Sequence, residues 1–264
     1  MTKQPTRLRI LLLGGTTEAS ALAGMLAGRD EFKATLSLAG RTANPSPAPI
    51  PTRTGGFGGQ AGLIDYINRE QIDVMVDATH PFAAQMSRNA VAAGTAIGCA
   101  LIAIERPAWK AVPGDSWRRV PDVGAAIAAV GAAPRRVLMA IGRQQLAMLK
   151  AAPHHHYVIR VIDPPESPPD VPDFKLIQAR GPFTVEGEKE LFRREKIDVL
   201  VTKNSGGVAT SAKLEAARLL GIPVIMVERP EVPSRATVAS AAEAIAFLAF
   251  HHWFNRDHLA NRGV

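Results

Sequence analysis

The sequence predicts an α/β protein of two similar Rossmann-like domains, each a doubly wound parallel sheet, with a cleft between them. Short apolar runs alternate with segments of helical spacing along the 264 residues, which is typical of β-α-β units. Several of these segments recur in the second half in the same order. Glycine-rich and polar loops follow the predicted strands, where sheets of this kind bind ligands.

Four buried strands are predicted in the first half, because short apolar runs stop abruptly at glycine or polar residues. They cover residues 9–13, 33–39, 72–76 and 99–104. Helical spacing predicts one helix over 16–26 and a second from a glycine-rich turn to about Glu70. A third helix is predicted to begin at His80-Pro81, because proline fits the first turn of a helix. Four prolines between positions 45 and 51 predict an irregular loop.

The second half repeats this order. Strands are predicted over residues 136–139, 157–162, 175–178 and 197–201. Helices are predicted over 144–150, from Gly181-Pro182-Phe183 to about 195, and over 238–254. A second proline-rich loop lies between positions 164 and 172.

Three matches indicate that one β/α unit has been duplicated. The segments that begin at 9, 72 and 105 recur at offsets of 127 (136 minus 9), 125 (197 minus 72) and 123 (228 minus 105). General similarity among buried strands does not explain the shared Ile-Asp-Val and Glu-Arg-Pro. We therefore expect a first domain over 1–110, a connecting segment over 111–133 and a second domain over 134–264.

Composition excludes several classes of function. The formal net charge of +7 attracts anions, but the basic pairs are scattered and no aromatic RNA motif accompanies them, so we expect no nucleic-acid partner. The single cysteine, Cys99, excludes an intramolecular disulfide and is expected in the core. Without a signal-peptide pattern or an apolar run of roughly 18 residues, we expect a cytoplasmic protein with no membrane partner.

The first predicted strand leads into a glycine-rich turn and a helix. Glycines let a ligand approach the backbone, and a helix N-terminus favours phosphate. Thr16 replaces the second glycine of the usual dinucleotide fingerprint, so a plain tight turn is an equal alternative. Arg41 follows the second strand, where an arginine suits the 2′-phosphate of NADP, although a surface arginine fits equally. The turn consists of Gly14, Gly15, Thr16, Thr17 and Glu18.

Two further loops carry residues capable of chemistry. Thr79 and His80 follow the third strand, and either is a candidate cap of the next helix. For His80, the alternatives are a hydrogen bond to cofactor or substrate and the donation of a proton. The matching loop, residues 203–207, offers a cation, an amide, a hydroxyl and bare backbone, which suits a carboxylate or phosphate. Adjacent histidines at 154–156 point to opposite sides if extended, so we expect no metal site.

Together these loops resemble the precorrin-6A reductase family of cobalamin (vitamin B12) biosynthesis. The resemblance runs from about residue 8 to 248 and rests on six motifs in the right order. They are Gly14-Gly15-Thr16-Thr17-Glu18-Ala19, Asp77-Ala78-Thr79-His80-Pro81-Phe82, Glu105-Arg106-Pro107-Ala108-Trp109, Ala140-Ile141-Gly142-Arg143, Gly181-Pro182-Phe183 and Lys203-Asn204-Ser205-Gly206-Gly207.

The resemblance implies reduction of precorrin-6A to precorrin-6B by NADPH, with a hydride to C19 and a proton to C18. Its substrate is a cobalt-free tetrapyrrole with many carboxylates, which agrees with the basic net charge, and the product would pass to other enzymes of the pathway. The implied cofactor-binding residues are Gly14, Gly15, Thr16, Thr17, Glu18, Arg41, Ala78, Thr79 and His80, with His80 the catalytic candidate. The implied substrate-binding residues are Arg143, Lys203, Asn204, Ser205, Gly206 and Lys213.

Two alternatives are a nucleotide-sugar reductase or epimerase and a non-catalytic NADP-binding regulator. The first usually needs a Tyr-x-x-x-Lys pair, but Glu70 and Val161 stand four residues after the two tyrosines. The second would bind NADPH without consuming it.

Overall fold

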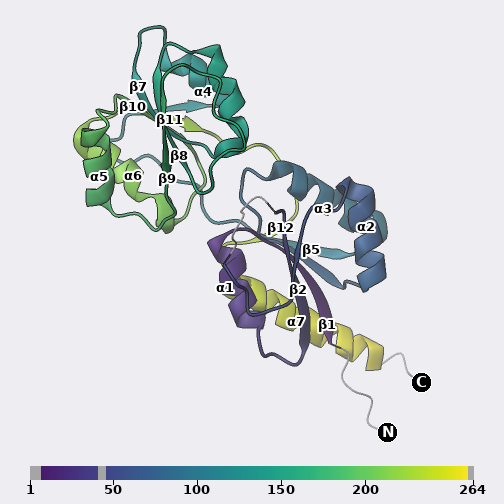
Figure 1. Ribbon diagram of the computed structural model, residues 1–264. Coiled ribbons are helices and arrows are strands. Elements are labelled where there is room, and N and C mark those ends of the chain that lie inside the picture. The colour runs from purple at the N-terminus through teal and green to yellow at the C-terminus, as the bar shows by residue number, and fades with distance from the viewer. Residues whose placement is uncertain (1–6, 41–45, 261–264) are drawn as a thin grey trace. The chain divides into compact units, whose positions relative to one another are not determined.

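The computed structural model describes residues 7–40 and 46–260, with side chains as far as Phe254. Within these residues the chain forms two six-stranded sheets, and all the paired strands are parallel (Figure 1). The first sheet has the order β12 (Ala236–Val238), β5 (Ala100–Ile104), β4 (Val74–Asp77), β1 (Leu8–Leu13), β2 (Phe32–Leu38) and β3 (Thr52–Thr54). The second has the order β6 (Trp117–Val120), β11 (Val224–Val227), β10 (Val199–Lys203), β7 (Arg136–Ala140), β8 (His156–Val161) and β9 (Phe174–Gln178).

Helices cover both faces of the first sheet. Because neighbouring strand residues point to opposite faces, Ile10 and Leu12 pack in the core that includes α1 (Thr17–Leu26) and α7 (Ala241–Ala260). Leu11 and Leu13 pack in the core formed with α2 (Gly59–Glu70) and α3 (Ala84–Ile97), two helices that lie side by side in Figure 1. All four side chains are almost fully buried, which stabilises the fold by roughly 1.5–3 kcal/mol each. The apolar run of β1 thus specifies a strand between two helical layers.

The second sheet is built in the same way. Leu138 of β7 and Leu200 of β10 pack in one core with α5 (Val185–Arg194) and α6 (Ala212–Leu220). On the other face α4 (Val123–Val130) packs against β6 and β11 and beside η1 (Arg143–Ala151), a 3₁₀ helix. The predicted doubly wound α/β fold class is therefore confirmed for both halves.

The predicted domain boundaries are wrong. One compact unit comprises the residues up to Arg106 together with those from Glu231 on, and the other comprises Pro107–Pro230. The expected connecting segment, 111–133, contains β6 and α4 of the second sheet. The C-terminal residues, expected in the second domain, return with β12 and α7 to the first.

The reason for this difference is an exchange of strands. The strand after β5 is β6, which pairs with β11, and the strand after β11 is β12, which pairs with β5. Each half thus supplies the sixth strand of the other half's sheet and covers an edge that would otherwise present unpaired backbone groups. The repeated Glu105-Arg106-Pro107 and Glu228-Arg229-Pro230 stand at the two crossing points.

The internal repeat extends to single hydrogen bonds. Asp73 Oδ2 accepts the backbone N–H of Arg9 at 2.7 Å, and Asp198 Oδ2 accepts that of Arg136 at 2.8 Å. Both aspartates immediately precede a central strand, β4 or β10 in its sheet. The shared Ile-Asp-Val therefore has a structural reason, because its aspartate ties the start of one strand to the start of the next.

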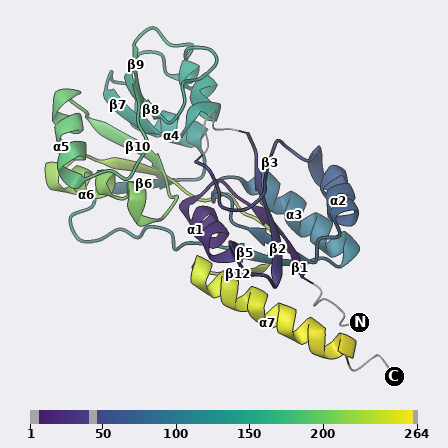
Figure 2. The same cartoon turned by 60° about the horizontal axis from the view of Figure 1, so that its bottom comes forward.

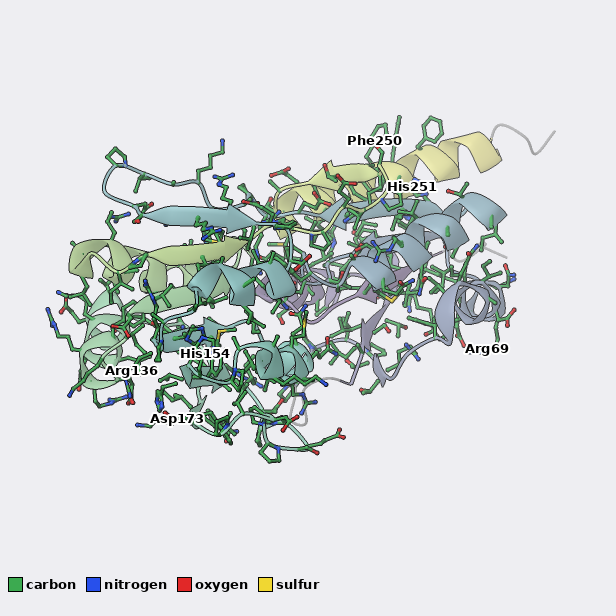
Figure 3. All side chains as sticks on the ribbon, turned by 90° about the horizontal axis from the view of Figure 1, so that it is seen from above. Arg69, Arg136, His154, Asp173, Phe250 and His251 are labelled. Carbon is green, nitrogen blue, oxygen red and sulfur yellow. The ribbon has the colours of Figure 1, made fainter. Side chains whose placement is uncertain are left out.

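The last helix has one buried and one exposed side. Figure 2 shows α7 along the first unit, and its residues Ala244 and Leu248 are fully buried in the core shared with α1. Phe250 points away from the sheet in Figure 3 and is 62% exposed. In the described part of the chain no helix combines the length and apolarity needed to cross a membrane.

Candidate active site

The turn between β1 and α1 is shaped by two glycines with different functions. A Cβ on Gly14 would lie 2.5 Å from Leu36 Cδ1, so any larger residue there would force the Leu36 side chain of β2 to move. Gly15 has a φ of +117°, and a Cβ there would meet no atom within 4 Å. Glycine is therefore required at position 15 by conformation, and open space lies beside its backbone.

The Thr16 side chain stabilises this turn with two hydrogen bonds. Its Oγ1 accepts the backbone N–H of Ala19 at 3.2 Å, which makes it the N-cap of α1. The same hydroxyl donates to the Ala78 carbonyl oxygen at 2.8 Å. The loops after β1 and β4, which hold the predicted cofactor-binding residues, are thereby joined at one edge of the sheet.

Glu18, in the first turn of α1, carries a charge that is paired within the unit. Arg106 Nη1 lies 2.9 Å from its Oε2, and Thr17 donates to the same oxygen at 3.1 Å. Burial opposes ionisation of Glu18, but its own backbone N–H and the Arg106 guanidinium leave the pKa below the usual value. Arg106, which sequence reasoning did not select, thus neutralises the acid nearest the glycine turn.

The loop after β4 is organised around a buried carboxylate. Asp77 Oδ1 accepts the backbone N–H of Thr79 at 3.1 Å and its hydroxyl at 2.7 Å. Asp77 Oδ2 accepts Ser87 Oγ of α3 at 2.6 Å. Thr79 therefore does not cap α3, one of the two functions that the sequence allowed; its hydroxyl proton is directed into the protein.

His80 does not cap the helix either. Its Nδ1 accepts the backbone N–H of Phe82 at 3.2 Å, and its carbonyl oxygen accepts that of Ala83 at 2.7 Å. The predicted helix start at His80-Pro81 is wrong, because this tight turn intervenes and α3 begins at Ala84. With Nδ1 as an acceptor, the neutral imidazole carries its proton on Nε2.

Arg41 lies outside the described residues. Near the end of β2, Arg53 Nη1 of β3 donates to Ser37 Oγ at 2.6 Å and to the Gly55 carbonyl oxygen at 3.0 Å. Its guanidinium also stacks over Phe57, 4.0 Å from the ring centre. Arg53 therefore orders the glycine-rich turn that precedes α2.

In the second unit, hydrogen bonds hold the loop after β10 to Trp109, which lies just after the first crossing point at Pro107. Asn204 is buried, and its Oδ1 accepts the backbone N–H of Trp109 at 2.8 Å while its Nδ2 donates to the Trp109 carbonyl oxygen at 3.3 Å. Trp109 Nε1 donates to the Gly207 carbonyl oxygen at 3.1 Å. Lys213 Nζ lies 4.6 Å from the centre of the Trp109 ring and donates to Thr210.

The same loop is held by the second crossing. Arg229 donates to the carbonyl oxygens of Asn204 at 2.9 Å and of Ser205 at 3.1 Å. Gly206 has a φ of +69°, and a Cβ there would overlap the Pro107 carbonyl oxygen and lie 2.7 Å from Arg229 Nη2. Three predicted substrate-binding residues, Asn204, Gly206 and Lys213, therefore have structural functions that the sequence did not reveal.

The remaining predicted residues lie at the carboxyl ends of their strands. Lys203 ends β10, and Ser205 follows it. Arg143 opens η1 after β7 and donates to the Pro164 carbonyl oxygen at 3.1 Å. Among the described residues, no group of three histidine, cysteine or acidic side chains is placed to hold a metal ion.

Comparison with known proteins gives a consistent result. Residues 9–249 match the model of the family described as precorrin-6x reductase CbiJ/CobK. The chain is 55% identical over 92% of its length to the precorrin-6A reductase of Rhodobacter capsulatus, covering 96% of that protein, and 51% identical to that of a Sinorhizobium species, with 93% of each chain covered. A solved structure of CobK precorrin-6A reductase superposes with a TM-score of 0.87 at 55% identity, over 92% of this chain and 96% of that one.

The match covers the glycine turn, the buried Asp77 loop and the locked loop after β10 alike. It also extends over the helices and strands of both units. The chain therefore belongs to the precorrin-6x reductase family CbiJ/CobK, a family of oxidoreductases of cobalamin biosynthesis.

Proposed function

We propose that the chain reduces precorrin-6A to precorrin-6B with NADPH. The observation that carries this proposal is the 55% identity with a protein named precorrin-6A reductase over nearly the whole of both chains. The basic net charge of +7 is consistent with a substrate that bears many carboxylates. The product is then handed to the next enzymes of the pathway.

The first unit is the proposed NADPH-binding unit. Gly15 offers open space beside the backbone, and the N-terminus of α1 favours a phosphate through its partial positive charge. Glu18 lies in the same helical turn, but its pairing with Arg106 reduces its repulsion of an anion. We assign Gly14, Gly15, Thr16 and Thr17 to the pyrophosphate and neighbouring groups, Glu18 to the same cofactor-binding turn, and Arg41 to the 2′-phosphate.

The loop of Ala78, Thr79 and His80 is assigned to the nicotinamide end. NADPH supplies the hydride, which we propose goes to C19 of the macrocycle. The residues of the chain bind and orient the reactants, which can account for a large part of the rate enhancement. His80, with its proton on Nε2, is the proposed donor to C18.

The second unit is the proposed site for the substrate's carboxylates. Arg143, Lys203 and Ser205 are assigned to direct contacts with these groups, since they offer two cations and a hydroxyl at the carboxyl ends of β7 and β10. Asn204, Gly206 and Lys213 are assigned to shaping the loop, because Asn204 and Lys213 are buried and Gly206 packs against the Pro107 carbonyl oxygen.

The test of the cofactor assignment uses Arg41→Ala with two cofactors. Loss of a charged hydrogen bond to the 2′-phosphate is expected to raise the KM for NADPH by about 10- to 100-fold. The KM for NADH, which lacks that phosphate, should stay within about twofold, so NADH serves as the control within the same variant. An unchanged KM for NADPH would show that the 2′-phosphate lies elsewhere.

A further inference from the structure

Asp77 is a buried carboxylate that no step of the proposed reaction uses. Only 2% of its surface is exposed, and both of its oxygens accept hydrogen bonds from the loop and from α3. A buried carboxylate is costly unless it is fully paired, so its retention at the end of β4 calls for an explanation in terms of the loop that it holds.

The charge of Asp77 is balanced by a residue from the far end of the sequence. Arg235 Nη2 lies 3.7 Å from Asp77 Oδ2 and 2.7 Å from Glu105 Oε1, and its side chain is 9% exposed. Arg235 belongs to the segment that returns to the first unit and leads into β12. Two acids and one arginine therefore brace the carboxyl ends of β4 and β5.

The hydrogen bond from Thr79 has a chemical consequence. A threonine hydroxyl has one proton and two acceptor lone pairs. The proton of Thr79 is given to Asp77 Oδ1 at 2.7 Å. Toward any ligand, Thr79 Oγ1 is then restricted to accepting a hydrogen bond.

We propose that Asp77 is a positioning residue that fixes Thr79 as an acceptor for the N–H of the nicotinamide carboxamide. This inference rests on the proposed function, in which Thr79 faces the nicotinamide. Asp77 acts on both the backbone and the hydroxyl of Thr79, so it sets the position and the polarity of that contact together.

The test compares the binding of NADPH with that of its acetylpyridine analogue, in which a methyl group replaces the carboxamide NH₂. An acceptor left without its donor costs the wild type about 5- to 100-fold in Kd for the analogue, measured by titration calorimetry. Thr79→Val should bind both nucleotides within about twofold of each other, whereas Thr79→Ser should retain the preference. Asp77→Ala should reduce the preference several-fold, because no side-chain oxygen then accepts the Thr79 hydroxyl proton and that hydroxyl becomes able to donate.

Asp73→Ala is the matched control, since Asp73 stands at the other end of β4 and accepts a backbone N–H from Arg9. It should keep the wild-type preference whatever its melting temperature. The inference is overturned if Thr79→Val discriminates as strongly as the wild type, or if Asp77→Ala loses stability but keeps the wild-type preference. A wild type that binds both nucleotides equally refutes this inference alone, and one that binds neither refutes the proposed function. If Asp77→Ala does not fold, the two Thr79 variants decide.

Discussion

Gly206→Ala should be markedly more destabilising than Gly221→Ala, although the two glycines have nearly the same backbone conformation. Their φ angles are +69° and +67°, so an alanine at either position costs about 1 kcal/mol in left-handed strain. A Cβ at Gly221 meets no atom within 4 Å, whereas one at Gly206 overlaps the carbonyl oxygen of Pro107. That overlap adds about 1–3 kcal/mol, because backbone of the crossing segment must move.

The expected loss in free energy of unfolding is therefore about 1 kcal/mol for Gly221→Ala and about 2–4 kcal/mol for Gly206→Ala. Urea unfolding followed by tryptophan fluorescence measures both, and Trp109, which contacts the same loop, is a local probe. Equal losses would show that the first crossing does not press on the loop. In that case the left-handed backbone conformation alone would account for the glycine at 206.

Three further experiments, two with substitutions and one with a thiol reagent, test separate parts of the structure. Asn204→Ala removes the side chain that hydrogen-bonds both the backbone N–H and the carbonyl oxygen of Trp109, and it should lower the free energy of unfolding by about 2 kcal/mol in denaturant titrations. A loss below about 0.5 kcal/mol would contradict the claim that these hydrogen bonds hold the loop in place. Burial and the nearby negative charge of Asp73 raise the pKa of the Cys99 thiol to about 11, so little reactive thiolate is present at pH 8. A disulfide reagent should therefore react with Cys99 roughly 100-fold more slowly in the native than in the unfolded protein, and equal rates would refute this. Arg106 helps to lower the pKa of Glu18, so their ion pair stabilises the fold above pH 4.5 and loses this effect as the pH falls through the folded pKa. Arg106→Gln should therefore lower the free energy of unfolding by less than about 1 kcal/mol at pH 7, and by progressively less in acid.

The central strands of both sheets were predictable from the sequence, because burial on two faces requires continuous apolar runs such as that of β1. Of the edge strands, β9 was predicted, but β3, β6 and β12 were not. In β6 the middle residues Arg118 and Arg119 are exposed, and β3 and β12 have only three residues each with little burial. Such strands are defined by their neighbours in the sheet rather than by their own pattern.

The exchange of strands was hidden for the same reason. A sequence with two repeats is compatible with self-contained sheets and with exchanged ones, because each edge strand finds an equivalent partner in either arrangement. The Glu-Arg-Pro repeat marked the crossing points, but nothing in its residue types says that the chain changes sheets there. Only the pairing of β6 with β11 and of β12 with β5 shows it.

The candidate site was partly predictable. Glycine and polar residues after the strands identified the loops, but contacts over long sequence separations decided what each side chain does. Arg235, 158 positions from Asp77 (235 minus 77), and Trp109, 95 positions from Asn204, left no local signal. For Asn204 and Lys213, a residue type suited to binding an anion is engaged in internal contacts.

Turnover of precorrin-6A in the presence of NADPH tests the central claim most directly. Under anaerobic conditions, the near-ultraviolet absorbance of NADPH and the visible spectrum of the macrocycle are followed together with the purified chain. We predict that one NADPH is consumed for each precorrin-6A converted, and that NADH supports the reaction poorly. Binding of NADPH without consumption, or a macrocycle spectrum that stays unchanged, would contradict the assignment.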